Sequence, residues 1–170
     1  MCATSKKTNG CLHRFTIMHQ DRYTEFKYND DLSVFVFISR GKYGDLIKVV
    51  NFGEIPGNVN VFNLSLGTLG PDGETDFISI TNNGDRNKIL VTVADIILKF
   101  MEMCPGKSVY ITGSDSRRTL LYQRAIAYGY DELVENFEIY GETSTHLPGS
   151  EFEPFDKAKS YSGFLIQKIY

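Results

Sequence analysis

Hydrophobic residues in the first half of the chain occur in short runs separated by turn residues. In residues 33–38, Ser33 is followed by a continuous apolar run, which predicts a central strand buried on both faces. After a glycine-containing turn at 39–45, residues 46–52 predict the partner strand of a hairpin. Residues 59–66 alternate apolar and polar, which is typical of a half-buried strand. The short connections predict an antiparallel β-meander.

The period then changes to that of a helix. Asp85 is predicted to be the N-cap, with its carboxylate accepting a backbone N–H, and Pro105-Gly106 is predicted to end the helix. Between residues 86 and 104 the apolar positions recur at steps of three and four, and therefore share one face: Ile89, Leu90, Val93, Ala94, Ile96, Ile97, Phe100 and Met101.

A second helix is predicted to begin near Asp115. Gly129 is expected to kink or interrupt it, and Asp131 to cap a short continuation to Phe137. The apolar segments around Phe77 and at 109–112 precede the two helices and predict two strands lying parallel in one sheet.

This strand–helix–strand–helix order has a consequence for function. Parallel strands joined by a right-handed crossover place both helix N-termini at the edge of the sheet where ligands usually bind. Exposed N–H groups there attract anions. The predicted ligand-binding residues lie in the two turns that open the helices: Asn83, Gly84, Asp85, Arg86, Ser114, Ser116, Arg117 and Arg118. The alternative is that the arginines are solvated surface charges and the two serines are helix caps.

The remaining segments complete a single α+β domain over residues 13–170, preceded by a flexible tail at 1–12. Residues 137–140 and 162–170 predict strands, and 141–158 predict a long functional or mobile loop. Segments 13–18 and 23–28 give weaker strand signals. The expected fold is an N-terminal meander followed by a β-α-β-α-β-β half, with both helices packed on one twisted mixed sheet.

Composition narrows the classes of function. Lys and Arg number 18 and Asp and Glu 21, so the formal charge is −3, with no general attraction to nucleic acid or acidic membranes. Cys2, Cys11 and Cys104 match no zinc spacing, and Cys104 is expected to face the core. There is no secretory signal pattern and no apolar run of ~20 residues, so a cytoplasmic location is predicted. The sequence indicates no oligomeric state.

Complete chemical motifs are not present. The chain has no Gly-x-Ser-x-Gly elbow and no glycine-rich phosphate loop of either familiar kind. No metal site is predicted, because Asp72, Glu74 and Asp76 are interpreted as surface carboxylates. Nucleic-acid binding is a further alternative. It rests on a basic, aromatic helix in which arginines contact phosphates and tyrosines stack on bases: Arg117, Arg118, Tyr122, Arg124 and Tyr128.

Several motifs together resemble an uncharacterised family of bacterial cytoplasmic proteins. They are Phe37-Ile38-Ser39-Arg40-Gly41, Asn82-Asn83-Gly84-Asp85, Thr92-Val93-Ala94, and Thr112-Gly113-Ser114 followed by Arg117, Leu121 and Tyr122. This resemblance covers most of the chain after Tyr23 and implies no particular activity.

The order of elements also resembles that of the acyl-CoA-dependent N-acetyltransferase superfamily. The resemblance implies that the turn at 82–88 receives the pyrophosphate of coenzyme A or acetyl-CoA, and that Tyr122 is a general acid. Asp115 and Arg118 stand where that superfamily commonly has Asn and Ala, and the turn offers Gly84 as its one small residue.

Three functions follow as hypotheses. The first is a small binding protein that accepts an anionic small molecule at the two helix N-termini. The second is an acyl-CoA-dependent N-acyltransferase using Tyr122. The third is a nucleic-acid-binding accessory protein.

Overall fold

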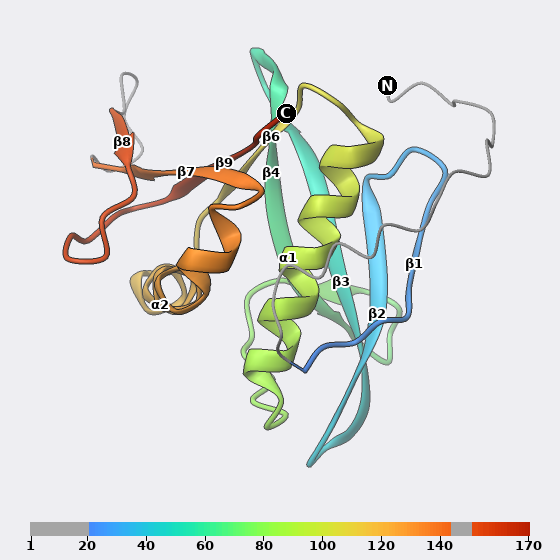
Figure 1. Ribbon diagram of the computed structural model, residues 1–170. Helices are drawn as coiled ribbons and strands as arrows, with labels where there is room; N and C mark the ends of the chain where they lie inside the picture. Colours follow the sequence, from blue (N-terminus) through green and yellow to red (C-terminus); the bar gives the residue numbers. More distant parts are fainter. Residues whose placement is uncertain (1–20, 144–150) are drawn as a thin grey trace.

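The computed structural model describes residues 21–143 and 151–170, and the predictions for 1–12 and 13–18 lie outside them. Within the described residues, two helices pack on one mixed, mostly antiparallel sheet of nine strands (Figure 1). The strand order is β1-β2-β3-β4-β6-β9-β7-β8, and β5 pairs with β4. The predicted α+β fold is therefore confirmed.

The first half is the predicted meander. It consists of β1 (Phe26–Tyr28), β2 (Val34–Gly41), β3 (Gly44–Ile55) and β4 (Asn58–Leu69), all paired antiparallel. The expectation that β2 is buried on both faces was wrong. Phe35 and Phe37 are buried because they lie on the face of the sheet that both helices cover. Ile38 lies on the opposite face and is 41% exposed.

The crossover helix leads to the strand predicted at 109–112, but the parallel partner of that strand differs from the prediction. Helix α1 (Arg86–Met103) connects β4 to β6 (Ser108–Ile111), and these two strands pair parallel. The predicted strand around Phe77 does not form, since β5 contains only Thr75–Asp76. The chain leaves the sheet there because the Asp76 carboxylate accepts the backbone N–H groups of the second and third residues after it, which folds the backbone into a turn.

The second half comprises α2 (Ser116–Leu133), β7 (Phe137–Glu142), β8 (Phe152–Pro154) and β9 (Phe164–Lys168). Strand β9 lies between β6 and β7, antiparallel to both. Strand β8 falls inside the segment predicted as a loop and pairs with β7, while residues 144–150 lie outside the described part.

Helix α2 runs unbroken through Gly129, so the predicted interruption and the Asp131 cap were wrong. One glycine lowers helix stability by only ~1 kcal/mol relative to alanine. Ile126 and Leu133 are buried on either side of Gly129, and their packing outweighs that loss.

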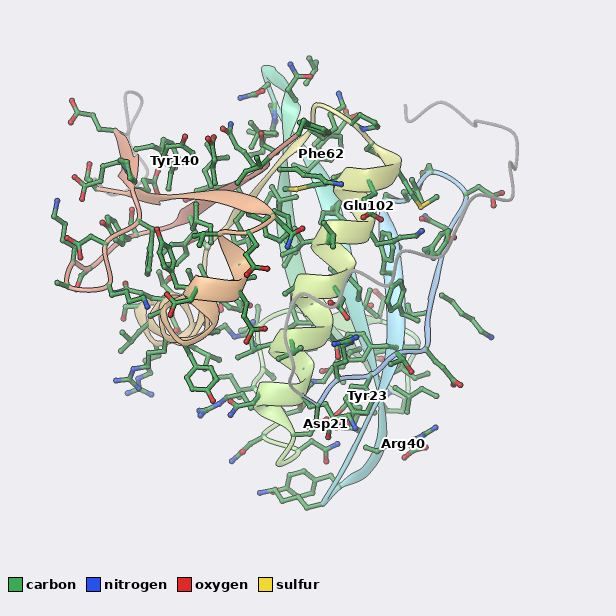
Figure 2. All side chains as sticks on the ribbon, viewed as in Figure 1. Asp21, Tyr23, Arg40, Phe62, Glu102 and Tyr140 are labelled. Atoms are coloured by element: carbon green, nitrogen blue, oxygen red, sulfur yellow. The ribbon has the colours of Figure 1, made fainter. Side chains whose placement is uncertain are left out.

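The core lies between the helices and one face of the sheet. Phe52 of β3 and Phe100 of α1 stack with ring centroids 4.1 Å apart, and both are almost completely buried. Cys104 is buried in the same cluster, as predicted. Helix α1 begins near Tyr23 and Arg40 and ends near Phe62 and Glu102 (Figure 2). Neither helix in the described residues has the length and apolarity needed to cross a membrane.

Candidate functional site

A cavity of about 380 Å³ lies between the first turns of α1 and α2. Its walls come from β3, β4, the segment 79–85 and both helices. The cavity is situated beyond the paired region of β4 and β6, towards the carboxyl end of each strand. The charged and ionisable residues that line it are Lys48, Asp85, Arg86, Arg117, Arg118, Tyr122 and Arg124.

Five of the eight predicted ligand-binding residues line this cavity: Asn83, Asp85, Arg86, Arg117 and Arg118. Gly84, Ser114 and Ser116 do not. Neither serine is the helix cap, because Asp115 holds that position and its carboxylate accepts the backbone N–H of Arg118 at 2.9 Å.

Three arginines make the cavity cationic. Arg86, Arg117 and Arg124 are exposed, and the ion pairs found among residues 21–143 and 151–170 include none of them. Their guanidinium groups retain donors for an incoming anion. Guanidinium groups bind carboxylate and phosphate through paired hydrogen bonds.

Arg118 has a different role from the one predicted for it. Its guanidinium is buried and donates to the carbonyl oxygens of Phe77, Ile78 and Ser79 at 2.5, 2.8 and 2.7 Å. These bonds tie the segment after β5 to the start of α2. Arg118 therefore shapes the cavity wall and has few donors left for a ligand.

Lys48 was not among the predicted residues. It lies on β3, is only 6% exposed, and donates from Nζ to the hydroxyls of Thr68, at 2.7 Å, and Thr81. Burial lowers the pKa of the Lys48 ammonium, Arg118 lowers it further, and the Asp85 carboxylate opposes both. A signal for it existed in the sequence, because Lys48 is in phase with the inward-facing Val50 and Phe52.

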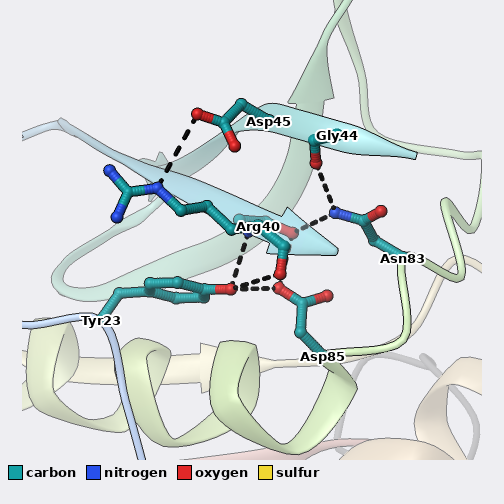
Figure 3. A network of polar contacts seen from close by, with 7 residues as sticks. Tyr23, Arg40, Gly44, Asp45, Asn83 and Asp85 are labelled. Atoms are coloured by element: carbon teal, nitrogen blue, oxygen red, sulfur yellow. Dashed lines mark hydrogen bonds and ion pairs between the residues drawn. The ribbon is translucent and has the colours of Figure 1, made fainter. Parts of the chain in front are cut away.

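Asp85 is the N-cap residue of α1, as predicted, but its carboxylate does not make the predicted hydrogen bond to a backbone N–H of the first turn. Its Oδ2 instead accepts hydrogen bonds from the hydroxyls of Tyr23 at 2.7 Å and Ser39 at 2.6 Å (Figure 3). Its Oδ1 is buried and has no hydrogen-bond partner within the described residues. With the carboxylate turned towards β2, no side chain caps the first N–H groups of α1.

Asn83 fixes the segment before α1 onto the β2–β3 hairpin. It is buried, and its amide nitrogen donates to Ser39 Oγ at 3.0 Å and to the Gly44 carbonyl at 3.1 Å (Figure 3). Its amide oxygen accepts the backbone N–H of Tyr43 at 2.9 Å. A side chain at residue 41 would place its Cβ 1.9 Å from the backbone carbonyl oxygen of Asn83. The close packing of the hairpin against Asn83 therefore requires Gly41.

Tyr122 is half-buried in the cavity wall on α2. Burial raises the pKa of its phenol, and the neighbouring Arg118 partly offsets that effect. The phenol is therefore protonated at neutral pH and can donate a proton or a hydrogen bond. Of the two tyrosines predicted to stack on bases, Tyr122 is thus half-buried, whereas Tyr128 is 76% exposed.

Among the residues that the structure describes, no group of three His, Cys, Asp or Glu side chains is placed to hold a metal ion. The carboxylates of Asp72 and Asp76 instead accept backbone N–H groups in their own turns.

The fold and the cavity define an α+β protein with a cationic hollow at the carboxyl side of a parallel strand pair. The chain belongs to the family of unknown function DUF6934, whose profile matches residues 19–169. No curated protein and no solved structure matches it.

Proposed function

We propose that this protein binds an anionic, phosphate-bearing small molecule in the cavity between the N-termini of α1 and α2. One observation carries the proposal: three guanidinium groups without a carboxylate partner in the described chain surround a single cavity. They are Arg86, Arg117 and Arg124.

The helix termini support the same ligand. The first backbone N–H groups of a helix carry partial positive charge and favour anions. At α1 these groups have no side-chain cap, because the Asp85 carboxylate is bound to Tyr23 and Ser39. The overall charge of −3 leaves this local positive field in place, because solvent ions screen distant charges.

Acyl transfer from acyl-CoA is the second candidate, supported by the order of elements. A meander leads into α1, β6, α2 and the final strands, as in the acyl-CoA-dependent N-acetyltransferase superfamily. On this reading the pyrophosphate of the cofactor binds at the start of α1. Tyr122, which lines the same cavity, donates its proton to the departing thiolate.

Binding is tested by thermal unfolding with inorganic phosphate, pyrophosphate, ADP, coenzyme A and acetyl-CoA, followed by titration of whichever raises Tm. Removing one guanidinium–phosphate contact is expected to weaken binding roughly tenfold to hundredfold, the equivalent of ~1.5–3 kcal/mol. We therefore expect that loss in both Arg117→Ala and Arg124→Ala. Arg40→Ala is the matched control, because Arg40 is an exposed arginine that does not line the cavity. Unchanged affinity in both cavity variants would refute the assignment.

A comparison of ligands and one further variant distinguish anion binding alone from acyl transfer. If the protein transfers an acyl group, coenzyme A stabilises it more than pyrophosphate or ADP does. In that case Tyr122→Phe removes acetyl transfer to an amine and leaves acetyl-CoA binding intact. If Tyr122→Phe transfers acetyl at the wild-type rate, Tyr122 is not the acid.

A further inference from the structure

A second, apolar cavity of about 280 Å³ continues from the cationic one. It lies between α1 and α2, with Leu64, Ile111 and Ile166 of the sheet among its lining residues. The two cavities share five lining residues, so they meet along a common wall: Arg86, Leu90, Leu121, Tyr122 and Arg124. The two cavities together, called the hollow below, are thus lined by charged residues at one end and by hydrophobic residues at the other.

We propose that the hollow takes an anionic amphiphile, with its charged head among the arginines and its hydrocarbon part between α1 and α2. This inference rests on the proposed anion site and names the class of ligand that fills the whole space.

Small side chains create the room for the hydrocarbon chain. Ala94 of α1 and Ala125 of α2 both line the apolar cavity, each contributed by one of the helices that border it. The strand positions among its lining residues are aliphatic or aromatic. Water in such a space lacks the polar partners that hold buried water in place.

The positions of the arginines determine the orientation of the ligand in the hollow. Arg86 and Arg124 stand at the junction of the two cavities and carry no ion pair in the described chain. A wholly polar ligand leaves the apolar space unfilled, and a wholly apolar ligand leaves the guanidinium groups without a counter-charge. A molecule with one anionic end and one hydrocarbon end satisfies both parts of the hollow.

The test is a series of n-alkyl phosphates from ethyl to dodecyl, titrated into the full chain by calorimetry below their micelle concentrations. We expect Kd to fall roughly three- to fourfold for each added methylene until the cavity is full. That ratio corresponds to ~0.8 kcal/mol per buried methylene. A Kd independent of chain length overturns the inference. If pyrophosphate still binds in that case, the anion site itself stands; if it does not, both proposals fail.

Filling the cavity is the second arm. Ala94→Phe and Ala125→Phe are expected to abolish the dependence on chain length and to keep the affinity for pyrophosphate, which also shows that the variants are folded. Ala158→Phe, an exposed alanine outside both cavities, is the matched control and is expected to behave as wild type. A chain-length dependence that survives both filled variants overturns the placement.

Other occupants are separated in the same experiments. Dodecanoate compared with acetate, and dodecanoyl-CoA compared with coenzyme A, show whether a free fatty acid or a fatty acyl thioester gains more from the chain. No gain in either pair overturns the inference. So does a dimer in sedimentation velocity that Ala94→Phe dissociates, because a second copy of this chain would then cover the groove.

Discussion

Lys48 shows how one residue departs from the pattern around it. It stands in an apolar strand, with its ammonium buried against the hydroxyls of Thr68 and Thr81 and near the guanidinium of Arg118. Hydroxyls accept its hydrogen bonds, and the Asp85 carboxylate offsets only part of the cost of burying its charge. Burial therefore disfavours the charged form and lowers the pKa of Lys48 from 10.5.

The lowered pKa predicts how the stability of a Lys48→Met variant depends on pH. The unfolded chain holds the proton more tightly than the folded chain, so wild-type stability rises as pH increases from the folded pKa towards 10.5. Methionine has no such titration. We expect the stability of Lys48→Met relative to wild type to be greatest at neutral pH and to decline towards pH 10.5.

Urea unfolding at several pH values between neutral and 10.5 measures this difference. Lys27→Met, at an exposed position on β1, controls for the loss of one lysine. A difference between Lys48→Met and wild type that stays constant over the whole range would contradict the prediction.

At the scale of elements, the segment 77–85 determines the shape of the site. Asp76 turns it away from the sheet, Arg118 holds its first carbonyls, and Asn83 ties its end to the β2–β3 hairpin. Each of these bonds joins the segment to a different neighbour, so its conformation depends on three separate parts of the fold.

Arg118→Ala is expected to lower the free energy of unfolding by ~2–3 kcal/mol, because hydrogen bonds to charged groups contribute ~1.5–3 kcal/mol. Three carbonyls lose their donor at once in this variant. The adjacent Arg117→Ala is the control, with an expected change within ~0.5 kcal/mol, because Arg117 is exposed. Equal urea midpoints for the two variants would show that Arg118 does not hold the segment.

At the scale of the whole molecule, stacked aromatic side chains join the two layers. Phe100 of α1 lies against Phe52 at 4.1 Å and meets Phe62 edge-on at 5.3 Å. The helix is thereby anchored to both strands of the β3–β4 pair. This contact lies away from the cavity, whose lining residues include none of the three rings.

Phe100→Ala is expected to destabilise the fold by ~3–5 kcal/mol, the usual result of removing a fully buried aromatic ring. Met103→Ala on the same helix is the control, with an expected loss below ~1 kcal/mol, because Met103 is 38% exposed. Denaturant unfolding of both variants provides the measurement. A similar loss in the two would contradict the central position of Phe100.

The meander, both long helices and the final strand could be predicted because each has a local sequence pattern: an apolar run or an alternation bounded by turn residues for the strands, and apolar residues three and four positions apart for the helices. The strand predicted around Phe77 from its local pattern does not form. Its apolar residues match a strand, but Ile78 is 78% and Ile80 63% exposed. Whether an apolar run joins a sheet depends on the partners available to its backbone, and here Asp76 and Arg118 bind that backbone instead.

The same reasoning explains which of the residues that line the cavity were predicted. Arg86 and Arg117 were identified because they flank helix starts, which local sequence marks. Lys48 was not predicted as a site residue, and Arg124 was named only for the nucleic-acid-binding alternative. Both reach the cavity only when β3 and the middle of α2 are packed around it.

The sequence by itself determined the meander, the two long helices and the final strand, since periodicity and turn residues act over a few positions. Only the tertiary structure decided that β4 is the parallel neighbour of β6, that Arg118 is a clamp, and that two cavities meet between the helices. These features depend on contacts between residues far apart in the chain. The free energies of such contacts cannot be read from a local sequence pattern.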